Sequence, residues 1–215
     1  TYTAPRLSLG VNLYYMKYKD QLVPTGMVND DSNALNTNVP DSYRRGVELS
    51  ASWRATGWFT VGANATFSQN RIENYVDALK DSPTYGKELG DMTIAYSPDV
   101  IANAFLNFHH RGFEAVFHTQ HVGKQYFTNN ENDALSLDAY CVTNLNLAYT
   151  FRTRSARSVR LGLLINNLFN AEYESNGYGY SYMDTWSGPA PVRIDEAYYF
   201  PQAPLNVLAN VTVKF

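Results

Sequence analysis

Tyrosines recur at every second position near the end of the chain, and side chains with this spacing could bind a ligand together. The segment Asn176 to Trp186 reads NGYGYSYMDTW. If it is extended, Tyr178, Tyr180 and Tyr182 share one face, because successive side chains of a strand point to opposite faces. Trp186 follows closely. Such a row offers stacking and hydroxyl hydrogen bonds to a bulky ligand such as a metal chelate, a corrinoid or a glycan. The alternative is that the rings extend an aromatic belt above a membrane.

The histidines and the single cysteine argue against a metal centre. His118 and His121 are three positions apart on a predicted strand, so they point to opposite faces. His109 and His118 could share a face from adjacent strands with Glu114 nearby, which we interpret as a hydrogen-bonded wall contact. Cys141 is the one cysteine and no CxxC spacing occurs. We predict no metal site and no cofactor.

Two polar stretches carry oxygen ligands of the kind that calcium uses. They are NDDSN at Asn29 to Asn33 and NNENDA at Asn129 to Ala134. Both lack the fixed spacing and glycine of a known calcium loop, so we predict solvated loop tips and leave calcium open. The sequence has no nucleophile elbow, no HExxH and no placed triad, so no enzyme is predicted.

Composition narrows the class of protein. The 215 residues are 45% hydrophobic and only 17% charged, and the mean hydropathy is −0.35. The net charge of −3 argues against a nucleic-acid partner, because proteins that bind nucleic acid usually carry an excess of positive charge. No apolar run approaches the roughly 18 residues of a spanning helix, so strands must cross any bilayer. The chain opens on Thr1 without a signal peptide, which predicts processing or a longer parent protein.

Alternation of apolar and polar residues predicts strands in eight segments. Each is close to the length of about 9–11 residues that a tilted membrane strand needs. The closing strand runs to the last residue, with Val207, Ala209, Val211, Val213 and Phe215 on its apolar side. The segments are Leu7–Tyr18, Tyr43–Arg54, Phe59–Gln69, Val100–His109, Phe113–Val122, Ala139–Phe151, Val159–Asn170 and Leu205–Phe215.

The connections between these segments alternate in length. Short links lie at residues 55–58, 110–112 and 152–157, and long ones at 19–42, 71–99, 123–138 and 171–204. Long structureless loops are uncommon in compact soluble domains. Short turns that alternate with long loops are typical of an outer-membrane barrel, whose turns are periplasmic and whose loops are extracellular. We therefore predict an all-β, antiparallel transmembrane β-barrel segment of about eight strands.

Aromatic residues favour the same orientation. One set falls at the short-turn ends and predicts an interfacial girdle: Trp53, Trp58, Phe59, Phe108, Phe113, Phe151 and Phe215. Tyr126 and Phe127 lie at a long-loop end, so they join the opposite belt and the candidate ligand contacts. A soluble sandwich is the alternative fold. Its wet face would be rich in Lys and Glu, whereas the polar face here carries mainly Ser, Gly, Asn and Thr.

Three stretches together resemble one family. They are YRRGVELSASW at Tyr43 to Trp53, LLINNLFNAEYESNGY at Leu163 to Tyr178, and YYFPQAPLNVLANVTVKF at Tyr198 to Phe215. They are similar to the C-terminal β-barrel portion of TonB-dependent outer-membrane receptors in the style common in Bacteroidetes, which are Gram-negative. The resemblance spans essentially the whole chain and covers part of the family's length.

The resemblance implies a barrel of about twenty-two strands with an N-terminal plug. Residues 1–215 would then form one β-barrel segment, with the plug and the earlier strands absent. A self-contained eight-stranded barrel with a structural or adhesive role is the alternative. Its interior must be filled by side chains, and small inward residues would leave voids, so we favour the segment. Those small residues are Ser8, Gly10, Ser50, Ser52, Thr60, Gly62 and Gly162.

The family implies a function and partners as well. The function is TonB-dependent uptake of a large scarce nutrient, namely a ferric siderophore, haem or cobalamin. Oligosaccharide and peptide are the next candidate ligands. The partners are outer-membrane lipid, the rest of the receptor including its plug, the TonB complex through the N-terminal part, the barrel-assembly machinery and a surface lipoprotein. Phe215, Val213 and Val211 would be the assembly signal. The inward charges should pair with each other or with the plug: Arg44, Glu48, Arg54, Glu114 and Arg160.

Overall fold

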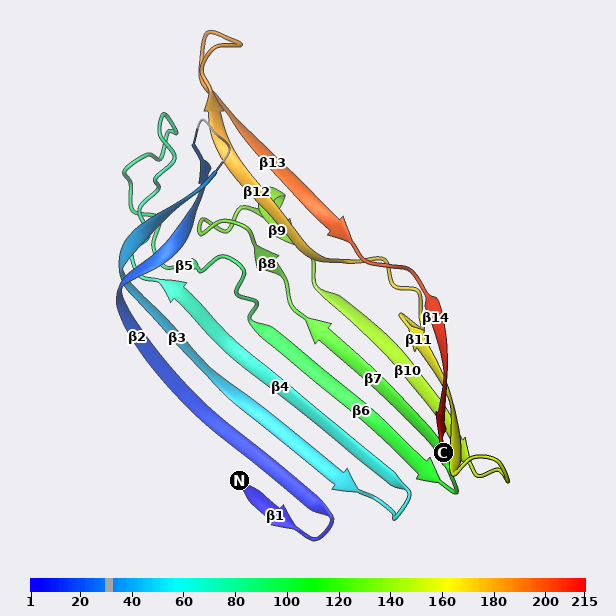
Figure 1. Cartoon of the computed structure of the whole chain (residues 1–215). Coiled ribbons are helices and arrows are strands. Elements are labelled where there is room, and N and C mark those ends of the chain that lie inside the picture. The colour runs from blue at the N-terminus through cyan, green and yellow to red at the C-terminus, as the bar shows by residue number, and fades with distance from the viewer. Residues whose placement is uncertain (30–32) are drawn as a thin grey trace.

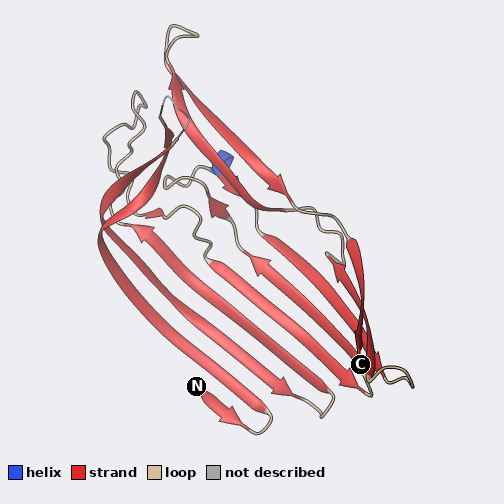
Figure 2. Cartoon of the chain, in the orientation of Figure 1, coloured by secondary structure: helices blue, strands red, loops and turns tan. Residues whose placement is uncertain are grey.

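The structure is a computed structural model that describes residues 1–29 and 33–215. A curved antiparallel sheet dominates it, and most long connections gather at one end of the sheet (Figure 1). Strands make up most of the ordered backbone, with one short 3-10 turn, η1 (Asp133–Leu135), among the described residues (Figure 2). In that part of the chain no helix is long and apolar enough to cross a membrane.

Eight long strands of the described chain form the main sheet, which we call the wall. Neighbours pair in the order β1-β2-β3-β4-β6-β7-β10-β11-β14, and short β5 (Met92–Thr93) pairs with β4. Each of these pairings is antiparallel. Short turns require this for β3 with β4, β6 with β7 and β10 with β11. The bounds are β1 Tyr2–Ala4, β2 Leu7–Val28, β3 Ala34–Arg54, β4 Phe59–Ile72, β6 Val100–His110, β7 Phe113–Val122, β10 Tyr140–Phe151, β11 Ser158–Asn166 and β14 Asn206–Lys214.

The register places apolar side chains on one face of the wall. Val11, Leu49 and Ala65 are cross-strand neighbours, and the row continues to Ala102 on β6. No other layer of the described chain covers this face, because Val11 is 63% and Val211 is 65% exposed. Lipid is the medium that such a face requires. The predicted antiparallel transmembrane segment of about eight strands is confirmed.

Strand lengths agree with the prediction in some places and differ in others. β7 has the predicted bounds. In contrast, β2 continues well beyond Tyr18, and β3 begins well before Tyr43. Their ladder extends through pairs such as Gln21 with Val39, so the backbone groups of residues 19–42 bond to each other. The expectation of a structureless loop there was wrong. It was also wrong for residues 171–204, which contain a hairpin.

Larger cross-strand partners cover two glycines of the polar face. A Cβ on Gly62 would lie 2.2 Å from the Phe105 ring, which pairs with it directly. A Cβ on Gly46 would lie 2.6 Å from the Tyr14 hydroxyl, and Tyr14 is its partner on β2. Rings over glycines fix register in designed sheets in the same way.

The wall is an open sheet. β14 pairs with β11, β2 pairs with β1 and β3, and no ladder joins β2 to β14 among the described residues. A closed eight-stranded barrel requires that ladder. The alternative of a self-contained small barrel was therefore wrong.

Aromatic rings gather at the short-turn end of the wall, as predicted. The Trp58 and Phe108 rings are 5.2 Å apart, and Phe108 is 5.9 Å from Phe113. These rings come from three strand ends brought together by the register. Such a cluster is the usual mark of a membrane interface.

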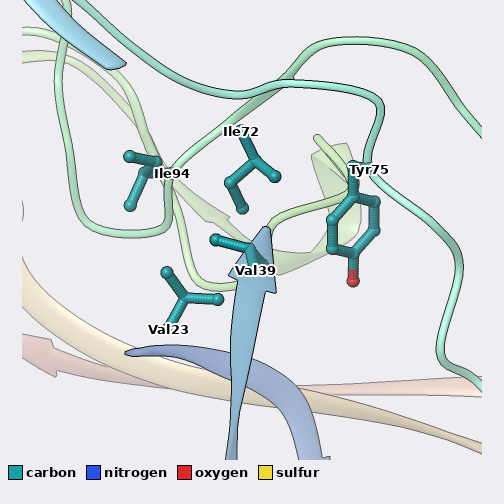
Figure 3. Packing of buried hydrophobic residues seen from close by; sticks show 5 residues of the cluster. All are labelled: Val23, Val39, Ile72, Tyr75 and Ile94. Carbon is teal, nitrogen blue, oxygen red and sulfur yellow. The ribbon is translucent and has the colours of Figure 1, made fainter. Parts of the chain in front are cut away.

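The long connections at the opposite end form a second region, which we call the cap. One small core joins Val23, Val39, Ile72, Tyr75 and Ile94, and Figure 3 shows these side chains converging from β2, β3, β4 and the connection after β4. A second core joins Phe127, Leu135 and Leu137. Short strands β8 (Gln125–Tyr126) and β9 (Ser136–Leu137) pair beside it. The cap is thus folded protein with its own buried side chains.

Candidate functional site

The predicted tyrosine row lies on a hairpin in the cap. β12 (Glu174–Asp184) pairs with β13 (Val192–Pro201), and the register sets Tyr178 opposite Tyr198 and Tyr180 opposite Glu196. Because side chains alternate along β12, Tyr178, Tyr180 and Tyr182 share one face. The predicted common face is present, although the second strand was not predicted. β12 also contacts β2, so the hairpin reaches from near one edge of the sheet toward the other (Figure 1).

The rings form a continuous aromatic row. Tyr178 stacks on Tyr198 at 4.9 Å between centroids, and Tyr198 lies 6.4 Å from Tyr180. Tyr182 is 6.4 Å from Tyr180 and is nearly parallel to the Trp186 indole at 6.3 Å. Beyond Tyr178 the row continues to Phe200, at 6.1 Å. Trp186 is 74% exposed, and Tyr178 and Tyr198 are 46% and 44% exposed. Trp186 and the stacked pair of Tyr178 and Tyr198 are therefore open to a ligand.

A carboxylate that the sequence did not single out organises this row. The hydroxyls of Tyr180, Tyr182 and Tyr198 all donate to Glu196, at 2.6, 3.2 and 2.9 Å. The Tyr180 hydroxyl, followed by the other two, holds the pKa of Glu196 below its usual range, and the same hydrogen bond raises the pKa of Tyr180. Three hydroxyls are thus engaged within the hairpin. These hydrogen bonds hold the row in place, which preorganises it for a ligand.

The opposite face of the hairpin packs on the cap. A Cβ on Gly177 would lie 2.8 Å from the Phe127 ring, and one on Gly179 would lie 2.9 Å from Leu135. Phe127 is 1% exposed, which removes it from the candidate ligand contacts. Tyr126 stays partly exposed, with Lys124 5.0 Å above its ring. The two neighbouring aromatics therefore have different roles, one as core and one as surface.

The sequence predicts a solvated loop tip at Asn129 to Ala134, and the structure shows that this is wrong for Asn129, although Asp133 and Ala134 are exposed. Asn129 is 1% exposed. Its Oδ1 accepts from the Ala95 amide at 2.7 Å, and its Nδ2 donates to the Pro24 carbonyl at 2.6 Å. This one side chain thereby ties three long connections together. The other tip, NDDSN, includes residues 30–32, which lie outside the described residues.

Glu131 in the same tip forms a second tie. It accepts from the Arg71 guanidinium and from the Thr93 amide, the latter at 3.0 Å. Burial alone would raise the pKa of Glu131, but the Thr93 hydrogen bonds and the Arg71 charge outweigh burial and lower it. The tip oxygens are therefore used in protein contacts. Sequence patterns gave no signal for this tie, because Arg71 and Glu131 lie far apart along the chain.

A polar recess lies on the concave side of the wall, below the cap. It has a volume of about 470 Å³, and its lining includes Arg44, Glu48 and Tyr96. Arg44 donates to Asn70 at 3.1 Å, and Asn12 donates to Glu48 at 2.9 Å. Burial raises the pKa of Tyr96. The recess offers positively and negatively charged hydrogen-bonding groups to a ligand or to a protein segment inside the barrel.

The other inward charges and the histidines follow the predicted strand faces. Glu114 and Arg160 form a two-pronged ion pair at 2.7 and 2.9 Å, as the expectation of paired inward charges requires. His118 lies opposite Phe105 on the polar face and His121 opposite Ala102 on the apolar face. The described residues contain no group of three or more His, Cys, Asp or Glu that could hold a metal ion.

Comparison with known proteins identifies the fold. The family described as TonB dependent receptor-like, beta-barrel matches residues 1–168. The ferric yersiniabactin uptake receptor FyuA from Yersinia pestis is 18% identical, with a TM-score of 0.67, and the match covers 100% of this chain and 28% of FyuA. The ferric-catecholate import receptor Fiu from E. coli K12 is 18% identical, with a TM-score of 0.62 and coverage of 96% and 25%.

A third solved structure gives the same result. The siderophore receptor PiuA from Acinetobacter baumannii is 15% identical, with a TM-score of 0.64 and coverage of 96% of this chain and 26% of PiuA. The chain thus spans about a quarter of the length of the solved receptors it matches. An open wall with one lipid-exposed face is what a part of such a barrel looks like. The chain belongs to the TonB-dependent receptor β-barrel family of the outer membrane.

Proposed function

We propose that this chain forms the C-terminal part of the wall, and four of the extracellular connections, of a receptor that takes up a large scarce nutrient through TonB. The observation that carries the proposal is the combination of three surfaces on one sheet. The apolar face is exposed, the concave face carries a polar recess, and the cap lies at the end of the sheet opposite the short turns.

The proposed ligand is a ferric siderophore, haem or cobalamin. FyuA is a ferric yersiniabactin uptake receptor, Fiu is a ferric-catecholate import receptor and PiuA is a siderophore receptor. The exposed rings of the aromatic row suit a bulky, flat or chelated ligand. Tyr178, Trp186 and Tyr126 are the proposed contacts, with Tyr180 and Tyr182 holding the row in place. Oligosaccharide and peptide are the next candidate ligands.

The proposed partners follow from the family. A plug would fill the concave side, where Arg44 and Glu48 have room for further contacts, and the TonB complex would act through the N-terminal part of the receptor. The barrel-assembly machinery would read the strand that ends in Val211, Val213 and Phe215, and a surface lipoprotein could cover the cap. The proposed role is transport, with no enzymatic step.

The test is uptake by cells that carry the full-length receptor. A panel of radiolabelled ferric siderophores, haemin and cyanocobalamin is offered to cells with the wild type, with Tyr178→Ala/Trp186→Ala, or with Tyr85→Ala as an exposed cap control. We expect the double variant to lower uptake of one panel member about tenfold, as the loss of two stacking contacts implies. Surface abundance should stay constant. Equal losses of uptake and abundance would return these rings to a structural role.

A further inference from the structure

The lipid-facing side of the wall carries a hollow that the transport role leaves unexplained. Its volume is about 590 Å³, and it lies across β2, β3, β4 and the start of β6. Val47, Phe67 and Val100 are cross-strand neighbours that form its apolar part. In the next row toward the cap, Arg45 pairs with Gln69. The hollow therefore changes from apolar to cationic in the direction of the extracellular surface.

The guanidinium of Arg45 is held by a neutral side chain. Its Nε and Nη2 both donate to one Gln69 oxygen, at 2.9 and 2.6 Å, and its centre lies 5.2 Å from the centroid of the Tyr43 ring. None of the ion pairs among the described residues includes Arg45. Lys17, one row nearer the cap, is by contrast paired with Glu73 at 2.9 Å. Arg45 is thus the free cation at the rim of the hollow.

Arg45 lies at the depth of lipid headgroups. Trp53, in the girdle at the short-turn end, is eight residues away on the same strand. That separation is about 26 Å along the strand at ~3.3 Å per residue. A tilt of about 40° reduces this to roughly 20 Å of depth, close to the ~25 Å apolar band of such barrels. The outward-facing guanidinium is therefore at the outer-leaflet interface.

We propose that this hollow binds one phosphorylated lipid of the outer leaflet. Its phosphate lies on the Arg45 guanidinium, which is preorganised by Gln69 and Tyr43, because the planar guanidinium fork matches phosphate oxygens. Its acyl chain covers Phe67 and the neighbouring valines, where burial of apolar surface is favourable. A second hollow of about 500 Å³ with an alanine floor, including Ala65 and Ala102, continues the path toward the membrane centre.

One acidic residue sharpens the proposal. Asp99 borders the same hollow immediately before β6. A carboxylate near the hollow repels a phosphate, so we expect Asp99 to weaken the site. Removal of this carboxylate should strengthen lipid binding, whereas removal of the guanidinium should weaken it. An unspecific apolar surface would respond to neither change.

The test uses the full-length receptor in detergent and native mass spectrometry. Diphosphorylated lipid A and its dephosphorylated analogue are added in turn, and the fraction of receptor that retains one lipid is measured. We expect retention of the phosphorylated lipid to fall about tenfold in Arg45→Gln, the usual scale for one charge-assisted contact. It should rise in Asp99→Asn. Arg152→Gln, an exposed charge at the short-turn end, should leave it unchanged.

Each variant is compared at an equal folded fraction, measured by heat-dependent electrophoretic mobility. Phe67→Ala provides a second route, because it should lower retention of both lipids by removing acyl contact. Equal retention of the two lipids by the wild type overturns the phosphate site. So does a fraction that is unaffected by Arg45→Gln. Retention of a second protein on this face, in place of lipid, also overturns it.

Discussion

The wall and the cap reach order by different means. In the wall, Val11 and Leu13 are 63% and 72% exposed, as expected of side chains that face lipid. In the cap, Ile72 and Phe127 are 0% and 1% exposed, since protein supplies theirs. The comparison shows that one chain can place its apolar side chains in two environments, an exposed face in the wall and a protein core in the cap. Burial inside protein marks the cap, and outward exposure of apolar residues marks the wall.

Polar groups divide along the same line. In the wall they pair between adjacent strands, as Asn103 does with Asn64 at 3.2 Å. In the cap they bridge segments distant in sequence, as Asn129 does with Pro24 and Ala95. A pair of strands stays paired if one side chain is lost, because the backbone hydrogen bonds between the strands remain. A cap held by single side chains is expected to open as a unit.

The largest expected effect breaks the cap without touching the wall. Phe127→Ala removes the ring against which Gly177 packs, and a buried Phe→Ala change costs about 3–5 kcal/mol. We expect faster hydrogen exchange, measured by mass spectrometry on the full-length receptor, in residues 123–138 and 174–201. β7 and β10 should keep their protection, because their ladder does not involve Phe127.

An exposed cap aromatic is the matched control for this change. Tyr85 is 56% exposed, so Tyr85→Ala removes a ring of similar size without opening a core. Its exchange pattern should match that of the wild type. If Phe127→Ala also releases β7 and β10, the two regions unfold together and their separation fails.

The second effect breaks the wall through its lipid face alone. Val11→Arg places a charge near the middle of the apolar band, where Arg costs about 2–4 kcal/mol. Asn12→Arg places the same charge one residue later on the polar face, where Glu48 can pair with it. We expect urea titrations of receptor folded into phosphatidylcholine vesicles to show the loss for Val11→Arg only. Similar losses for both would mean that lipid does not contact the Val11 face.

The third effect concerns the pH dependence of the cap. The folded-state pKa of Glu131 is lowered, so its contribution to stability is present above its ordinary pKa and is lost as the pH falls below that value. Glu131→Gln should loosen the cap at neutral pH by on the order of 1 kcal/mol, after a reduction for its partial exposure.

The same variant should also reduce the acid sensitivity of the cap. Hydrogen exchange of residues 92–95 and 129–133, corrected for the intrinsic effect of pH, measures both changes between pH 3 and 7. Wild type and variant should converge at the acid end, because protonated Glu131 is already neutral. A difference between them that is unchanged at acid pH would show that the Glu131 charge is not what ties the connections.

The wall was predictable from sequence because its pattern is local. A period of two over Phe113 to Val122 is enough to define β7 and both of its faces. The ends of β2 and β3 were missed, since residues 34–42 show no clear alternation and include Pro40. They form strands only because each pairs with the other. Loss of alternation therefore marks departure from the membrane and not the end of a strand.

The cap could not be predicted, because its contacts join residues distant in sequence. The shared face of Tyr178 and Tyr180 follows from their spacing. Glu196, which bonds to the row, appears only when β13 is placed beside β12. Phe127 was mistaken for a belt residue, since an aromatic side chain at a strand end looks the same in either environment. Only its packing under Gly177 and Gly179 reveals a core.

The smallest expected effect tests how the cost of a charged side chain depends on its depth in the membrane. Phe215 is 93% exposed at the end of the chain described here, and a Lys near the interface costs about 0–1 kcal/mol, rising to about 2–4 near the midplane. Phe215→Lys should therefore slow insertion into vesicles slightly, Val213→Lys more, and Val211→Lys most, with Phe215→Tyr unchanged. Insertion is measured by protection from added protease. If Phe215→Lys inserts normally in vesicles and fails only in cells, recognition by the assembly machinery outweighs depth at this position. If it behaves normally in both, neither the interfacial role nor the assembly role of Phe215 stands.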